Sequence, residues 1–507
     1  MPAMDGDDLT SQVNWVAWHL TQQLEEAAAT EQHRIMVNTH PVSRVSRVPD
    51  HLRVHNRDAY TPGLVAIGPL HSKDAERRLR PGNQLKRTYL NSLISRGHPD
   101  ASRHDVIQGY VRLVAARKHE AHAMYAAEDF DGITDVEFIQ MLVLDGCFII
   151  EHLVNVTTGK DEPLLHATPF GPVQLSVDLV LAENQIPFFV LVDLISSSRL
   201  PEFDSTGYDP PVLLMKLVLY YLGGERGRDM SEALPPAKDV CHILHVLHAM
   251  VVAARTRWEP PPRMQDSAPL EMMQEAARLL RRLPLLLLVP LLYPILPEER
   301  RWRASYGRED LPSASDLKRM WVRFKKVRGG SGSKAAAGIA SVLGPVPLTV
   351  KLAHEDRLRL PQLRIEFRTA PLLLNLMAFE QSAEQRAGDV SAYVWLMAKL
   401  VQSAEDAGVL VAAEVVHGGT TGNESKEDVA CFFRQMGSAS EAAGELEKSY
   451  LRETLQKLRE RSQDPLFMMW ADVQRNYFTV PWAVVAEFVT FFTFISTILQ
   501  TYGSFKH

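Results

Sequence analysis

Residues 136–154 have the sequence VEFIQMLVLDGCFIIEHLV, which decides the fold class. Wound as a helix, this stretch has apolar side chains on nearly every side, which is typical of a helix enclosed by other elements. Gln140 and Asp145 interrupt it, so it is a poor candidate for a membrane span. We therefore expect a buried helix over residues 135–156 in the core of a mainly α-helical domain.

A second apolar stretch, LVLAENQIPFFVLVDLI at residues 179–195, has the same character. Pro187 lies near its middle, and proline ends or kinks one helix while allowing another to begin. We expect helical segments on both sides of it. Isolated polar side chains occur in both apolar stretches: Asp145 in the first, and Glu183, Asn184 and Gln185 in the second.

A buried carboxylate must be paired, hydrogen-bonded or neutralised by a raised pKa. Asp145 and Glu183 therefore define a candidate buried polar network with Asn184 and Gln185. The arginine-rich stretch before it offers counter-charges: Arg44, Arg47, Arg53 and Arg57. Structural networks of this kind are commoner than catalytic pairs. The alternative is a hydrolase or transferase whose two carboxylates meet in a concave pocket.

Outside these stretches, helical spacing predicts a helix over residues 11–37. A proline-rich segment at 41–71 is expected to be extended, and mostly helices are expected after it. The later predicted helices cover residues 84–124, with a break at 97–99, and then 378–407, 426–436 and 441–461. Ser313 and Asp316 form a capping-box pattern, and apolar residues from Leu317 to Val327 predict one helical face. Two runs, PVPLTVKL and LPQLRIEF, predict a small β element near residues 344–368.

The composition excludes several classes of protein. The apolar fraction of 46% and charged fraction of 23% are ordinary for a folded chain of 507 residues. A net charge of -6 gives no general attraction to phosphate backbones, so no nucleic-acid partner is expected. Three scattered cysteines without CxxC spacing indicate a reducing compartment. No catalytic motif occurs, and no cofactor is predicted.

One histidine cluster is the strongest candidate for metal ligands. His242, His245 and His248 follow one another at steps of three, next to Cys241. Steps of three rotate around a helix, so these imidazoles do not converge on one ion without ligands from elsewhere. We expect core or surface histidines and assign no metal site.

Residues 482–499, WAVVAEFVTFFTFISTIL, form a candidate transmembrane segment. Its ten Val, Ile, Leu and Phe residues, Phe491 and Phe494 among them, favour insertion by about 3–6 kcal/mol, whereas Glu487 opposes it by about 2.5–3.5 kcal/mol. Trp482 and Tyr502 stand at the two ends, where such side chains favour lipid headgroups. The alternative is a helix that lies at a membrane interface or packs on the body of the protein, because polar side chains recur along one side of it.

Several segments together resemble a plant family known as domain of unknown function 247. The resembling stretches occur in family order: RVSRVPDHLRVHNRDAYTPGLVAIGPLH (44–71), EFIQMLVLDGCFIIEHL (137–153), LVLAENQIPFFVLVDL (179–194), LPSASDLKRMWVRFKK (311–326), LLLNLMAFEQ (372–381) and YFTVPWAVVAEF (477–488). The resemblance implies a plant protein with one large helical domain and a C-terminal membrane segment. Some grass members are associated with pollen-side self-incompatibility.

These observations predict three regions: an N-terminal helix in residues 1–40, a globular helical domain in 41–478 and a membrane-associated helix in 479–502. We expect a non-enzymatic, membrane-associated interaction or signalling protein with an unknown protein partner. The expected location is a membrane, such as the plasma membrane, crossed once near the C-terminus with the bulk in the cytosol. A soluble regulator whose last helix packs on the body is a further alternative.

Overall fold

The computed structural model describes residues 45–256 apart from 55, 74–77, 131 and 168, together with 311–327, 338–344, 347–353, 356–382, 388–418, 425–441 and 449–464. Five single positions, 467, 471, 493, 496 and 497, are also described. The helix predicted over residues 11–37 and the proline-rich stretch 257–310 lie outside these residues. So does the predicted membrane helix as an element, including Trp482, Glu487, Phe491, Phe494 and Tyr502.

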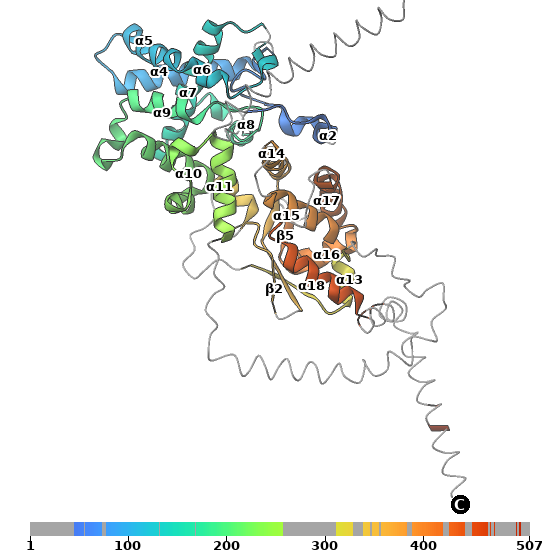
Figure 1. The fold of residues 1–507 in the computed structure, drawn as a ribbon. Coiled ribbons are helices and arrows are strands. Elements are labelled where there is room, and N and C mark those ends of the chain that lie inside the picture. Colours follow the sequence, from blue (N-terminus) through green and yellow to red (C-terminus); the bar gives the residue numbers. More distant parts are fainter. Residues whose placement is uncertain are drawn as a thin grey trace, which may run out of the picture. The chain divides into compact units, whose positions relative to one another are not determined.

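Helix α7 (Asp135–Thr158) is the centre of the first group of helices (Figure 1). Thr134 and Glu137 form a capping box at its start, and Gly159, with a φ of 68°, ends it. It contacts four other helices: α4 (Arg80–Gly97), α5 (Arg103–Ala116), α9 (Phe188–Ser197) and α10 (Pro210–Arg228). Among the described helices it alone has the length and apolarity of a membrane span, but 72% of that apolar window is buried, as predicted for a core helix.

The stretch around Pro187 differs from its prediction. Helix α8 (Gly171–Asp178) ends nine residues before Pro187, and residues 179–187 form buried turns rather than a helix. Asn184 and Gln185 donate side-chain hydrogen bonds to main-chain carbonyls of residues 178–184, which gives this segment an alternative to the helical ladder. Only the second predicted helix forms, as α9, after Pro187 at its N-cap.

Residues 45–68 are largely extended, as their prolines predict. They contain one short helix, α2 (Asp50–Arg53), and one 3-10 turn, η1 (Arg57–Tyr60). Other short helices and turns connect the longer elements: α6 (Lys118–His122), η2 (Ala127–Phe130), η3 (Leu165–Ala167), η4 (Pro201–Thr206), η5 (Ser231–Ala233), η6 (Ala237–Asp239) and η9 (Ile339–Leu343). Helix α11 (Ile243–Thr256) packs against α10 and α14.

The helix predicted from Ser313 to Val327 is wrong beyond its first turns. Ser313 caps helix α13 (Ala314–Arg319) as expected, but Trp321 has a φ of 64° and turns the chain. The amide of Val322 donates to Leu317 O at 2.8 Å, which closes a left-handed helix end. The next residues form strand β1 (Arg323–Lys326) instead of further helix.

Two small sheets follow, and they confirm the predicted β element while extending it. In the first, β3 (Arg357–Leu360) lies between β1, which runs parallel to it, and β2 (Lys351–Ala353), which runs antiparallel. In the second, β4 (Leu363–Ile365) pairs in parallel with β5 (Val416–Gly418). Strands β1 and β5 come from outside the predicted range of residues 344–368.

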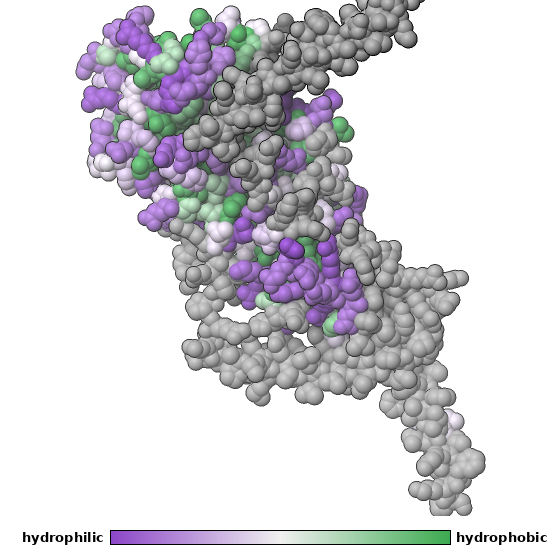
Figure 2. Space-filling model, viewed as in Figure 1, coloured by the Kyte–Doolittle hydropathy of each residue, from purple (hydrophilic) through white to green (hydrophobic). Residues whose placement is uncertain are grey.

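A second group of helices completes the described fold: α14 (Thr369–Gln381), α15 (Asp389–Leu400), α16 (Ala404–Ala412), α17 (Lys426–Glu441) and α18 (Arg452–Gln463). Helix α17 contacts α14, α15 and α16. One contiguous cluster of buried apolar side chains extends from Val45 to Leu458, so both groups share a core. On the face shown in Figure 2, the described surface is mostly hydrophilic with scattered hydrophobic residues. The predicted mainly α fold with a small β element is therefore confirmed.

Candidate functional site

Six main-chain amides of the extended segment 45–68 donate hydrogen bonds to distant buried side chains rather than to a neighbouring strand. A buried amide without a partner is destabilising, so each must find an acceptor. The acceptors are four buried side chains, which we call the anchoring network: Asp145, Asp178, Glu183 and Asn184. All four are at most 1% exposed.

Asp178, at the end of α8, holds residues 63–65 of this segment. Its carboxylate accepts from the amides of Gly63 at 2.9 Å, Leu64 at 2.7 Å and Val65 at 2.7 Å. Burial raises the pKa of Asp178, and these hydrogen bonds offset only part of that effect. Sequence reasoning missed Asp178, although it is a lone acid directly before the apolar stretch at 179–195.

Asn184 holds the next residues. Its Oδ1 accepts from the Ile67 amide at 2.6 Å, and its Nδ2 donates to the carbonyls of Val65 at 3.0 Å and Asp178 at 2.8 Å. Gln185 serves its own turn, because its Nε2 donates to three nearby carbonyls and its Oε1 accepts from the Leu244 amide at 3.2 Å. The side-chain amide groups of Asn184 and Gln185 therefore hold the nearby main chain in one conformation.

Glu183 has one main-chain partner and two side-chain partners. It accepts from the Val48 amide at 2.5 Å, forms an ion pair with Arg53 and lies 3.3 Å from His71 Nε2. Burial alone would raise the pKa of Glu183, but hydrogen bonds from His71, Arg53 and the Val48 amide outweigh it and hold the pKa below its usual range. Glu183 therefore remains a charged acceptor.

Asp145 has separate partners. It accepts from the Gly68 amide at 2.8 Å and forms an ion pair with Lys86, a buried residue of α4 that also donates to Ala66 O at 2.5 Å. Burial raises the pKa of Asp145 despite the opposing effect of Lys86. The two carboxylates therefore do not share a partner, as an acid–base pair would.

The predicted arginines have different roles. Arg53 joins the network through Glu183, whereas Arg47 pairs with Asp129 at 2.9 Å and is half exposed. Arg44 lies outside the described residues, and Arg57 is exposed.

Sequence reasoning missed Asn375 of α14, which is 0% exposed and links distant segments: it accepts from the Ala182 amide and donates to Ala59 O, each at 2.7 Å.

The predicted histidine cluster surrounds an aromatic ring. The rings of His242, His245 and His248 lie 5.1, 5.5 and 5.4 Å from that of Phe379. His248 Nε2 is 3.0 Å from Glu380 Oε1. In the described part of the chain, no group of three or more His, Cys, Asp or Glu residues could hold a metal ion.

Glu380 also contacts the hydroxyl of Ser391, but these side chains are not arranged as a catalytic nucleophile and its base are. Ser391 Oγ donates to Glu380 Oε2 at 2.8 Å, and the carboxylate accepts from the amides of Val390 and Ser391 as well. A catalytic serine is hydrogen-bonded to the base that takes its proton, with the carboxylate behind that base. Here the carboxylate lies between Ser391 and His248, where it caps the start of α15.

A groove lies on the surface beside the anchoring network. It is lined by residues 56–63, part of α8 and the start of α14, with Asp58, Arg78 and Gln174 among its polar residues. Phe367 at its edge is 66% exposed. Asp145 and Glu183 do not line this groove, so the two candidate carboxylates of the sequence do not open onto it.

Comparisons with known proteins agree with the resemblance seen in the sequence. The profile of DUF247, described as a plant protein of unknown function, matches residues 45–496. A UPF0481 protein of Arabidopsis thaliana is 24% identical over 470 residues, which cover 90% of this chain and 85% of that protein. A putative UPF0481 protein of the same plant is 27% identical over 174 residues, or 34% of this chain and 30% of that one. No solved structure matches.

Proposed function

This chain belongs to the plant protein family of unknown function DUF247, and from that premise we propose a non-enzymatic, membrane-associated protein that presents a rigid helical body to another protein. Its described part supplies the body. Residues 482–499 supply the attachment to a membrane. The partner is a protein that approaches the same membrane.

The observation that supports this proposal is the set of partners that the buried carboxylates bind. Asp145, Asp178 and Glu183 direct their oxygens at main-chain amides or at paired cations. A general acid or base needs an oxygen within reach of a substrate proton. These carboxylates are at most 1% exposed and anchor the extended segment 45–68. Their burial and their partners support a structural rather than a catalytic role.

The membrane attachment is supported by the sequence of residues 482–499. Eighteen residues with one charge are long enough to cross the apolar part of a bilayer. The polar side chains on one side would face another helix in the membrane, since a polar stripe is costly against lipid. We propose a single span with the helical body in the cytosol.

Two alternatives give different results. An enzyme built on Asp145 and Glu183 requires the two side chains to meet in an open pocket, whereas each has its own partners. A soluble regulator requires the 482–499 helix to pack on the body.

Pollen-side recognition is the finer form of our proposal, and loss of self-rejection in a deletion line would test it.

Membrane fractionation tests the proposal. The full chain and a truncation ending at Val480 are expressed side by side, and each membrane pellet is extracted with alkaline carbonate. We expect the full chain to resist extraction and the truncation to remain in the supernatant. The matched variant Glu487→Leu should bind at least as firmly, because it removes the one charge in the segment. A full chain that stays in the supernatant would refute membrane attachment.

A further inference from the structure

One face of the three-stranded sheet carries five cationic side chains. In the sheet register, Arg323 of β1 stands opposite Arg357 of β3, and Lys325 stands opposite Arg359. Arg359 also stands opposite Lys351 of β2. Residues directly opposite one another share a face, since side chains alternate along a strand. We call these five residues the basic sheet face: Arg323, Lys325, Lys351, Arg357 and Arg359.

The other face of this sheet is apolar and packs into the core. Phe324, Leu358 and Leu360 lie on it and are at most 6% exposed. The basic sheet face is therefore the face turned away from this core. Lys325 and Lys351 are exposed on it, and its three arginines are half-buried.

The basic sheet face places like charges opposite one another, which is destabilising in a sheet. It does so in a chain whose net charge is -6. Asp356 pairs with Arg323 and lies 3.9 Å from Arg357. Within the residues that the structure describes, Lys325 and Arg359 form no ion pair. An anionic partner would supply the counter-charge and offset the repulsion.

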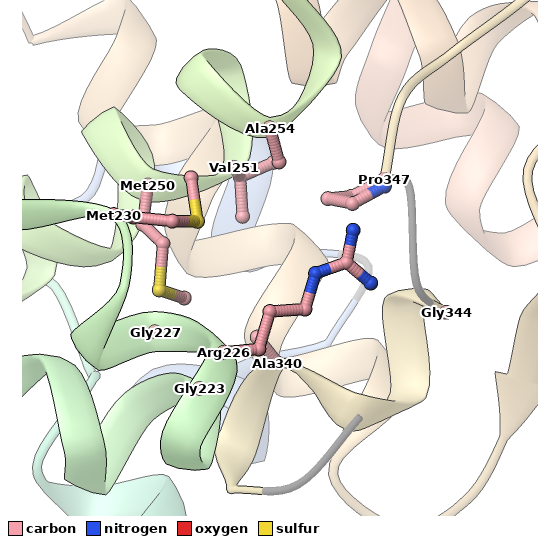
Figure 3. Close-up of a pocket in the computed structure, with 10 residues that line it drawn as sticks. All are labelled: Gly223, Arg226, Gly227, Met230, Met250, Val251, Ala254, Ala340, Gly344 and Pro347. Atoms are coloured by element: carbon pink, nitrogen blue, oxygen red, sulfur yellow. The ribbon is translucent and has the colours of Figure 1, made fainter. Parts of the chain in front are cut away.

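The cavity between α10 and α11 offers no rival site for such a partner. Figure 3 shows that Arg226 lines this cavity together with apolar residues such as Met250 and Val251. Its volume is about 30 Å³, which is room for about one or two water molecules. An anion with an organic body does not fit there, whereas the basic sheet face is on the surface.

The sheet lies next to the helix from which the chain continues toward the proposed membrane segment. Helix α18 contacts β2 and ends at Gln463 (Figure 1). Only residues 464–481 separate this helix from residues 482–499. Even fully extended, a chain of that length spans at most about 65 Å. This connection therefore keeps the basic sheet face within reach of the bilayer surface.

We propose that the basic sheet face binds the anionic lipid headgroups of the leaflet next to the helical body. This inference rests on the proposed attachment through residues 482–499. Each lysine or arginine near a leaflet rich in phosphatidylserine strengthens binding about fivefold. An acidic protein is the rival partner, but protein interfaces are enriched in aromatic residues at their centre. The remaining strand residue on this face is Ala353, so the sheet offers charge without an aromatic anchor.

Lysine acylation of the full chain reconstituted into vesicles tests the proposal. One set of vesicles is phosphatidylcholine alone, and the other is phosphatidylcholine and phosphatidylserine in equal parts. A membrane-impermeant reagent acylates exposed amines, and mass spectrometry gives the rate at each lysine. A surface potential of about -30 to -50 mV concentrates protons about three- to sevenfold at the leaflet, so the reactive free amine decreases by the same factor.

We expect phosphatidylserine to slow the acylation of Lys325 and Lys351 about three- to sevenfold. Lys238 is the matched control, because it is exposed on η6, outside the sheet, and its rate should change less. Raising the salt concentration to about 1 M shortens the Debye length to about 3 Å and should abolish the difference between the two kinds of vesicle.

Reversal of one charge locates the effect, and the ratio of rates in the two kinds of vesicle is compared within each variant. Arg359→Glu changes the residue opposite both Lys325 and Lys351 and should remove most of the slowing at these lysines. Arg112→Glu is the matched control, because Arg112 is exposed on α5. Arg359→Gln removes one charge without reversing it and should reduce the slowing in part. It keeps the test valid if Arg359→Glu does not fold.

Carbonate extraction of the same vesicles separates this inference from the membrane attachment. If the chain resists extraction but Lys325 and Lys351 react equally fast in both kinds of vesicle, the lipid site is overturned while the attachment stands. If extraction releases the chain but phosphatidylserine still slows the two lysines, the lipid site stands without the anchor.

Two further results would overturn the lipid site. Soluble polyglutamate that slows Lys325 and Lys351 where phosphatidylserine does not would assign the basic sheet face to an acidic protein. Undiminished slowing in a folded Arg359→Glu variant would show that the effect does not come from this face.

Discussion

Replacing Asn184 by leucine removes one member of the anchoring network without changing charge. The substitution leaves the Ile67 amide without its acceptor and takes one donor from the carbonyls of Val65 and Asp178. These three groups belong to residues at most 1% exposed, so water does not replace the lost partner. The extended segment should therefore loosen around residues 63–68.

The expected effect follows from these bonds. An unpaired buried amide is destabilising by about 1–3 kcal/mol, and each weakened carbonyl adds up to about 1 kcal/mol. Burial of the leucine side chain offsets about 1–2 kcal/mol of this. With both carbonyls contributing, the free energy of unfolding should fall by about 1–4 kcal/mol, which is a large part of the about 5–15 kcal/mol typical of folded domains.

Urea denaturation and amide hydrogen exchange measure the two consequences. The urea midpoint should fall, and the Ile67 amide should exchange faster than in the wild type. Asn91→Leu is the matched control, since Asn91 is exposed on α4 and the same substitution there should change neither quantity. If Asn184→Leu leaves both the midpoint and Ile67 exchange unchanged, the anchoring role of the network is wrong.

Two further predictions concern buried ionisable groups. His152 is 4% exposed, and among the residues that the structure describes neither of its ring nitrogens has a hydrogen-bond partner. Burial lowers its pKa to about 3 from 6.5, so stability present above pH 6.5 is lost as pH falls toward 3, by up to about 4–5 kcal/mol. His152→Leu should remove this acid sensitivity of the urea midpoint, His104→Leu on the surface should not, and equal sensitivity in both variants would contradict the assignment. Lys86→Met should lower the free energy of unfolding by about 3–5 kcal/mol because Asp145 loses its cation, and adding Asp145→Asn should restore part of it; no recovery in the double variant would argue against the pair.

The sequence predicted the elements whose patterns are local. The all-round apolar stretch at 136–154 gave a buried helix, and the prolines of residues 41–71 gave an extended segment. The pattern after Ser313 misled, because apolar residues at helical spacing continue past Trp321, where a left-handed turn ends the helix without a glycine to signal it.

Local patterns in the sequence did not predict which groups the side chains of the anchoring network bind. The candidate acids were visible as lone polar residues in apolar stretches, but their partners depend on which distant elements pack together. Asp145 pairs with Lys86 of α4 rather than with an arginine, and Arg47 pairs with Asp129. Asp178 borders an apolar stretch and Asn375 stands alone in LLLNLMAF, so the same local signal was present at both, but it does not say which distant main-chain groups they bind.

Hydrogen exchange of the full chain in lipid vesicles, compared with the truncation ending at Val480 in solution, tests the central claim most directly. The claim is that an internally anchored helical body is attached to a membrane by residues 482–499. It predicts slow exchange across 482–499 in vesicles and the same exchange in residues 45–464 of both forms. Faster exchange in the body of the truncated chain, with no protection of 482–499 by lipid, would contradict it.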